Sequence, residues 1–279
     1  MLLPRFLTAL IGVPLFLWAI WWGQIPFFIL FFGVTMLALY EYYTLAEESA
    51  WPVSKNLGLF CGALLSVSIF LFGTKMTPSS HSKLEIFFTP AVFSSILVIL
   101  ATNALLKKEK ENAFIDIAVT FLGLIYIVWS LSHLLMIRDL RPDGKWYTLF
   151  LFLVIWALDI GAYGGGRKWG RTKLAESISP HKTWEGVLTG TLCSLGVALL
   201  CQSIFLKTLK MSETFTLALV IAGLAQVSDL SESLFKRNVR VKDSGNLLPG
   251  HGGILDRFDS FLLVSPIYYY LLVLLAKSS

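Results

Sequence analysis

Long apolar segments recur along the whole chain, and they constrain its fold more than any other feature. A helix rises about 1.5 Å per residue, so about 20 apolar residues cross the roughly 30 Å of hydrocarbon in a bilayer. The chain is 56% hydrophobic and only 15% charged, which is typical of a membrane protein and excludes an ordinary soluble domain. The candidate spans are 6–22, 26–45, 57–73, 86–106, 113–137, 146–164, 183–206, 214–237 and 257–276.

These segments predict an all-α, polytopic integral membrane protein with about nine transmembrane helices and a polar active-site cavity open to the cytoplasm. We expect a single integral membrane domain over 1–279, in which 1–137 form N-terminal scaffold helices. The catalytic helices, 138–279, would carry both polar loops. Because Gly23 and Pro26 interrupt the apolar sequence, the first run is either a full span or half of a tight hairpin.

The distribution of cations predicts the orientation of the spans. With nine spans, the N-terminus lies on the same side as the loops near 46–56, 107–112, 165–182 and 238–256. That side receives fifteen of the 23 Lys and Arg residues. The positive-inside rule therefore places it in the cytoplasm, together with the two most polar loops.

A stripe of polar residues follows one face of the run 214–237. Ten charges lie between Asp229 and Asp259, and each would cost ~2.5–3.5 kcal/mol at a helix centre facing lipid, so the stripe must face protein, ions or water. Two interpretations are open: a functional site, or a buried network in which the acids of the stripe pair with its cations. The stripe has helical spacing and consists of Asp229, Glu232, Ser233, Lys236, Arg237 and Arg240.

The segment that follows the stripe favours a functional site. Its glycines (Gly245, Gly250, Gly252 and Gly253) allow the backbone to turn N–H groups toward an anion. Asp256 and Asp259 come next, at a spacing that projects both from one face of a helix, and carboxylates of this kind suit Mg²⁺ with substrate phosphates. The alternative is that the two acids cap the helix N-terminus. The cations expected to neutralise phosphate charge are Lys236, Arg237, Lys242 and Arg257.

The second polar loop, expected over 165–182, is also rich in glycine and cations. Asp159 precedes it, and Ser179 and Pro180 resemble the N-cap and first residue of the next helix. Lys182 would then oppose the dipole of that helix, which an anionic ligand would explain. The other interpretation, a cationic loop touching lipid headgroups, suits Lys168, Arg171 and Lys173. Together the two loops indicate metal-dependent phosphoryl or nucleotidyl transfer.

The sequence SLFKRNVRVKDSGNLLPGHGGILDRFD, residues 233–259, resembles the signature of the phosphatidate cytidylyltransferase family, also called CDP-diacylglycerol synthases. The segments SDLSES and SPHKTWEG are similar to the family as well, although the family more often has lysine at the position of His181. The resemblance implies an enzyme of phospholipid biosynthesis that condenses CTP with phosphatidic acid, giving CDP-diacylglycerol and pyrophosphate.

The resemblance also implies roles for individual residues. Asp229, Asp256 and Asp259 would hold Mg²⁺, with a second cation left open, and Ser233 and Lys236 would complete that catalytic centre. The residues expected to bind substrate are Asp159, Lys182, Arg237, Lys242, Asp243, His251, Gly252, Gly253 and Arg257.

The resemblance further implies an integral protein of the bacterial inner membrane whose active site faces the cytoplasm. Its partners would be CTP, phosphatidic acid and membrane lipids, with no nucleic acid and with a homodimer left open. The alternative activity is that of a CTP-dependent polyprenol or phytol kinase, which would move the γ-phosphate. A transporter would also bury charges, but the sequence has no visible repeat symmetry.

Overall fold

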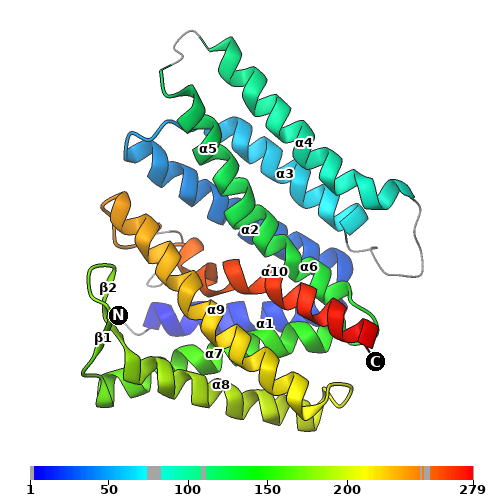
Figure 1. Ribbon diagram of the computed structural model, residues 1–279, viewed down its shortest axis with the longest axis vertical. Helices are drawn as coiled ribbons and strands as arrows, with labels where there is room; N and C mark the ends of the chain where they lie inside the picture. Colours follow the sequence, from blue (N-terminus) through cyan, green and yellow to red (C-terminus); the bar gives the residue numbers. More distant parts are fainter. Residues whose placement is uncertain (1–2, 74–82, 108–110, 246, 248–251, 279) are drawn as a thin grey trace. The chain divides into compact units, whose positions relative to one another are not determined.

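A computed structural model gives the fold, and it describes residues 3–73, 83–107, 111–245, 247 and 252–278 (Figure 1). The chain divides into two compact units. The first contains Met1–Leu140 and Val239–Phe258, and the second contains Arg141–Asn238 and Asp259–Ser279. The segment Val239–Phe258 therefore belongs to the unit of the N-terminal helices, although it follows the helices of the second unit in sequence.

The described residues contain eight helices that are long and apolar enough to cross a membrane. They confirm the prediction of an all-α, polytopic membrane protein, and each coincides with one of the candidate spans from 26–45 to 257–276. The remaining candidate, 6–22, falls on a helix with a shorter apolar segment, Gly12–Trp22. A full span for that run stays a prediction. The eight helices are Gln24–Glu48, Lys55–Phe72, Phe87–Leu106, Ala113–Asp139, Gly144–Trp169, Trp184–Ile204, Met211–Asn238 and Leu255–Ala276.

The first unit is built from helices that pack around two buried tyrosines of α2. Tyr42 and Tyr43 are almost fully buried, and the Tyr43 hydroxyl donates to Thr120 O at 2.7 Å, which satisfies its polar tip in an apolar core. The helices are α1 (Leu3–Trp22), α2 (Gln24–Glu48), α3 (Lys55–Phe72), α4 (Lys83–Leu106), α5 (Ala113–Gly123), the π-helix η2 (Leu124–Trp129) and α6 (Ser130–Asp139).

The chain breaks between α1 and α2 at Gly23, as the sequence predicts. Gly23 has φ +68°, a backbone conformation that favours glycine. The Arg138 guanidinium occupies the space beside Gly23 and donates from Nε to Ile20 O at 2.6 Å, which places a cation at the C-terminal end of α1. Pro26, the other predicted breaker, lies within the first turn of α2.

The second unit contains three long helices, a small hairpin and most of α10 (Figure 1). The strands β1 and β2 pair antiparallel, with Lys173 opposite Thr183. This hairpin was not predicted. The elements are α7 (Gly144–Trp169), β1 (Lys173–Ala175), β2 (Ser179–Thr183), α8 (Trp184–Ile204), α9 (Met211–Asn238) and α10 (Leu255–Ser278), of which residues from Asp259 onward belong to this unit.

The glycines near 165 do not form a loop, and the prediction of a loop that begins at 165 is wrong. Helix α7 continues to Trp169, and Gly161 and Gly165 within it allow a close approach to α8. A Cβ on Gly165 would collide with the Thr189 side chain, and one on Gly161 would lie 2.8 Å from Cys193 Sγ. Small residues that let helix backbones approach are a usual basis of packing between membrane helices.

The prediction of a helix start at Ser179 and Pro180 is also wrong. Both residues lie in β2, and Thr183 caps α8 instead, because its Oγ1 accepts the Gly186 N–H at 3.2 Å. Lys182 therefore lies on a strand, one residue before the N-cap of α8, and not in the first turn of that helix.

The polar stripe is helical as predicted up to Asn238, where α9 ends. Arg240 lies beyond the helix with φ +58°, so its inclusion in the helical stripe is wrong.

Two neighbouring glycines of α7 test the packing of α7 on α8. Gly165→Val should lower the unfolding temperature of the detergent-solubilised protein, since overpacking of this kind costs about 1–3 kcal/mol. Gly164→Val is the matched control, because nothing lies within 4 Å of a Cβ at Gly164. Equal unfolding temperatures for the two variants would contradict the close packing.

Candidate active site

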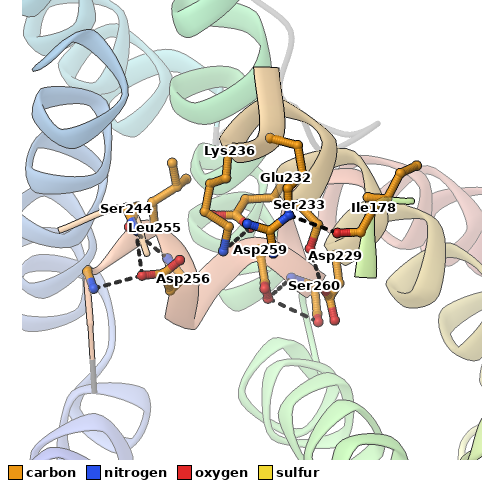
Figure 2. A network of polar contacts seen from close by, with 12 residues as sticks. Ile178, Asp229, Glu232, Ser233, Lys236, Ser244, Leu255, Asp256, Asp259 and Ser260 are labelled. Carbon is orange, nitrogen blue, oxygen red and sulfur yellow. Dashed lines mark hydrogen bonds and ion pairs between the residues drawn. The ribbon is translucent and has the colours of Figure 1, made fainter. Parts of the chain in front are cut away.

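The polar stripe of α9 forms paired contacts within the second unit (Figure 2). Glu232 is fully buried, and its Oε2 lies 2.6 Å from Lys236 Nζ one helical turn later. Ser233 Oγ donates to Asp229 Oδ1 at 3.4 Å. The interpretation as a buried ionic network therefore holds for Glu232 and Lys236, whereas Asp229 has a different partner.

The hairpin supplies the partner of Asp229. Lys182 Nζ, from β2, lies 2.6 Å from Asp229 Oδ2, and both side chains are partly exposed. Arg237 Nε donates to Ile178 O of the hairpin at 3.1 Å, so α9 and the hairpin are linked at two points. The hairpin thus carries Lys182 to an acid that lies 47 residues further along the chain.

The base of the hairpin is held by Glu185, in the first turn of α8. Its carboxylate oxygens accept the backbone N–H groups of Arg171 and Thr172, each at 3.1 Å. Because Glu185 lies only three residues after Lys182, these bonds fix both ends of the hairpin beside the start of α8. The position of Lys182 therefore follows from local structure.

Asp259 adds a third element to the site. Its backbone carbonyl accepts a hydrogen bond from Ser228 Oγ of α9, and Ser228 Oγ in turn accepts the Leu263 N–H at 3.1 Å. Ser228 therefore joins α9 to α10 at this point. The charges of Asp229 and Asp159 act repulsively on the Asp259 carboxylate, and that of Lys236 acts attractively. Carboxylates from α7, α9 and α10 thus share one region of the second unit.

This carboxylate group bears on the prediction of a magnesium site. The described residues contain no group of three or more His, Cys, Asp or Glu side chains arranged to hold a metal ion. Mg²⁺, however, is usually bound through one or two carboxylates, with waters and substrate phosphates as its other ligands. Asp229 and Asp259 are hard oxygen donors of the required kind, and their mutual repulsion would be relieved by a cation.

The glycine-rich segment belongs to the first unit, where carboxylates of the chain itself accept four N–H groups of its described residues. Asp256 Oδ2 accepts the N–H groups of Ser244 and Gly253, both at 2.9 Å. The N–H groups of Ile254 and Leu255 donate to Glu41. These four donors therefore do not face a substrate anion in this structure. Asp256 thus acts as a cap at the start of α10, the alternative that its sequence position leaves open.

The structure distributes the predicted site residues over both units. The second unit brings together Asp159, Lys182, Asp229, Ser233, Lys236, Arg237 and Asp259. In the first unit Lys242, Asp243 and Arg257 are exposed, whereas Gly252, Gly253 and Asp256 lie in the capped segment. His251 lies outside the described residues.

Sequence reasoning missed several polar residues of these groups. The sequence predicts Glu232 as part of the stripe and of a buried ionic network but not as a site residue, and it gives no signal for the hydroxyls of Ser228 and Ser244. Glu41 was missed too, although a carboxylate inside the apolar run 26–45 is a recognisable signal.

Comparisons with known proteins identify the chemistry that this arrangement supports. The model of the cytidylyltransferase family matches residues 3–275. The chain belongs to the cytidylyltransferase family. It is 34% identical over 276 residues to the phosphatidate cytidylyltransferase of Bacillus subtilis, which covers 97% of both chains.

Two other relatives bear the same name. The chain is 32% identical over 270 residues to the phosphatidate cytidylyltransferase of Staphylococcus epidermidis, covering 96% of this chain and 98% of that protein. It is 38% identical over 182 residues to that of Rickettsia bellii, covering 63% of this chain and 78% of the relative. The resemblance found in residues 233–259 is therefore confirmed over nearly the whole chain.

Membership of the cytidylyltransferase family makes the ion pair between Lys182 and Asp229 testable by activity. Lys182→Met should lower cytidylyltransferase turnover at least tenfold, because it removes a cation from a region that must accept phosphate charge. Lys210→Met is the matched control, since Lys210 precedes α9 at its other end and its side chain is 73% exposed. Equal turnover in the two variants would exclude Lys182 from the reaction.

Proposed function

We propose that the protein is a phosphatidate cytidylyltransferase, which transfers CMP from CTP to phosphatidic acid and releases CDP-diacylglycerol and pyrophosphate. The observation that carries this proposal is the position of the charged group of the second unit. Asp229 is paired with Lys182, and Glu232 is paired with Lys236, in and beside the membrane-spanning helix α9. Asp229 and Lys236 lie in the last ten residues of α9, so a lipid phosphate and a water-soluble triphosphate would meet near the end of that helix.

The reaction requires neutralisation of charge more than it requires a base. A phosphate oxygen of phosphatidic acid attacks the α-phosphorus of CTP, and the bond from that phosphorus to the bridging oxygen of the β-phosphate breaks. The electron pair leaves with pyrophosphate. Because the attacking phosphate is already an anion, no side chain has to remove a proton from a hydroxyl.

The cations of the site are suited to hold the two anionic substrates. Lys182 and Lys236 each have a carboxylate partner, so a substrate phosphate would compete with Asp229 or Glu232 for them. Arg237 Nε donates to the hairpin that carries Lys182, so the guanidinium charge lies beside that hairpin. We propose that these side chains bind and orient phosphates, and that Asp159 contributes to the same substrate-binding region.

The carboxylates would hold Mg²⁺. Asp229 and Asp259 are the ligands proposed from the second unit, with Asp256 added on the resemblance of its sequence motif. When bound, the ion would neutralise charge that develops on the transferred and leaving phosphates. Ser233 donates to Asp229 and Ser260 donates to Asp259, so these hydroxyls orient the two carboxylates. A second cation is left open.

The membrane setting supplies both substrates. We propose that the protein lies in the bacterial inner membrane with a polar active-site cavity facing the cytoplasm, where CTP is dissolved and the positive-inside rule places the cationic loops. Phosphatidic acid would enter from the surrounding lipid. Nucleic acid is not proposed as a partner, and association into a homodimer would be an additional property of the membrane domain.

Following phosphorus tests the proposed reaction directly. Purified protein supplied with phosphatidic acid and CTP labelled at the α-phosphate should transfer the label to a chloroform-soluble product and release pyrophosphate in equal amount. CTP labelled at the γ-phosphate serves as the control and should leave the lipid unlabelled. Lipid labelled only from the γ-position, with CDP accumulating, would identify a lipid kinase instead.

Removal of the metal tests the carboxylate ligands. EDTA should abolish turnover, and added Mg²⁺ should restore it. Asp259→Asn should raise the Mg²⁺ concentration for half-maximal turnover by about 10- to 100-fold, because it removes one ligand charge. Asp143→Asn is the matched control, since Asp143 contacts Thr208 at the other end of α7 and an amide oxygen can accept the same hydrogen bond. An identical Mg²⁺ response in the two variants would exclude Asp259 as a ligand.

A further inference from the structure

Glu41 is a buried carboxylate that the proposed reaction does not use. It lies in α2, seven residues before the end of that membrane-spanning helix, and only 4% of its surface is exposed. A carboxylate at such a position is unfavourable unless it is paired or hydrogen-bonded. Within the described part of the chain no cation lies at ion-pair distance from Glu41, so its partners must be hydrogen-bond donors.

Three donors converge on this carboxylate. Ile254 N–H donates to Oε1 at 2.8 Å, Leu255 N–H donates to Oε2 at 2.8 Å, and Ser244 Oγ donates to Oε2 at 2.9 Å. The first N–H groups of a helix have no partner within the helix, and α10 begins at Leu255. Glu41 therefore caps α10 from a different helix, with its charge at the positive end of the α10 dipole.

Two glycines make room for this carboxylate. A Cβ on Gly245 would lie 2.9 Å from Glu41 Oε1, and a Cβ on Gly253 would overlap Glu41 Oε2 and Ser244 Oγ. A larger residue at either position would displace the Glu41 side chain or the segment around it. Glycine at these two positions is therefore explained by the approach of Glu41.

Ser244 connects Glu41 to Asp256. Its hydroxyl donates to Glu41, its backbone N–H donates to Asp256 Oδ2 at 2.9 Å, and its Oγ accepts the Asp256 N–H at 3.3 Å. Asp256 Oδ2 also accepts the Gly253 N–H, next to the residues that Glu41 holds. The orientation of the Asp256 side chain thus depends on a segment whose position Glu41 fixes.

We propose that Glu41 is a positioning residue for cytidylyl transfer, which holds Ser244, Ile254 and the first turn of α10 so that Asp256 is correctly oriented. This inference rests on the proposed function. Glu41 lies about 200 residues before the motif in sequence, and it acts through Ser244 and the backbone without touching substrate.

The test compares Glu41→Gln with Glu48→Gln, the same substitution at an exposed position of α2. Glutamine has one oxygen acceptor, and its amide group would face a backbone N–H donor, so at least one of the three bonds is lost. We expect at least tenfold faster hydrogen exchange in peptides covering 241–247 and 252–258, with unchanged exchange in α7 and α8. Turnover should fall at least tenfold, and the Mg²⁺ concentration for half-maximal turnover should rise.

A double-mutant cycle tests whether Glu41 acts through Ser244. Ser244→Ala should also show faster hydrogen exchange and lower turnover. The double variant Glu41→Gln with Ser244→Ala should have no less turnover than the less active of the two single variants. If Glu41→Gln does not fold, Ser244→Ala measured against Glu48→Gln carries the test.

The outcomes separate this inference from the proposed function. If Glu41→Gln exchanges faster but has the same turnover and Mg²⁺ response as Glu48→Gln, then Glu41 is only a structural anchor. That result would overturn the inference. Unchanged exchange in Glu41→Gln would overturn it as well. Absence of label transfer from α-labelled CTP by the unsubstituted protein would overturn the proposed function, while the exchange measurements would still decide whether Glu41 holds the segment.

Discussion

Burial of charge within a membrane-spanning fold is the constraint on which the rest of the structure depends. An ionised side chain that faces hydrocarbon is expensive, so Glu232, Asp229 and Glu41 each have partners from the chain. Glu232 is fully buried and paired with Lys236, and Asp229 is paired with Lys182. Glu41 is satisfied by a hydroxyl and two backbone N–H groups instead.

These pairings also suit the proposed chemistry. A cation that rests against a carboxylate is already desolvated and oriented when a phosphate arrives, so less reorganisation is needed in the reaction. Asp229, once released from its pair with Lys182, is one of the ligands proposed for Mg²⁺. A hairpin carries Lys182, and Glu185 of α8 and Arg237 of α9 both hold that hairpin, so side chains of two helices position the cation.

Besides the positive φ at Gly23, glycine allows close approach at two places in the part of the chain that the structure describes. Gly161 and Gly165 allow α7 and α8 to approach closely. Gly245 and Gly253 make room for the Glu41 carboxylate. In both cases the missing Cβ matters because of what lies opposite the glycine. A glycine-rich sequence therefore indicates close approach without indicating the partner.

The sequence by itself determined the membrane-spanning helices, the helical stripe from Asp229 to Arg237 and the family, because hydrophobic length, helical periodicity and motif spacing are local properties. It did not determine the β1–β2 hairpin or the continuation of α7 through Gly165, since each involves a neighbouring element. The cap at Thr183 is a local contact, but Ser179 and Pro180 also resemble a helix start. Only the tertiary structure decided that Lys182 meets Asp229 and that Glu41 caps α10. The residues of these contacts lie 47 and more than 200 positions apart, and hydrogen bonds between them form only once the helices have packed.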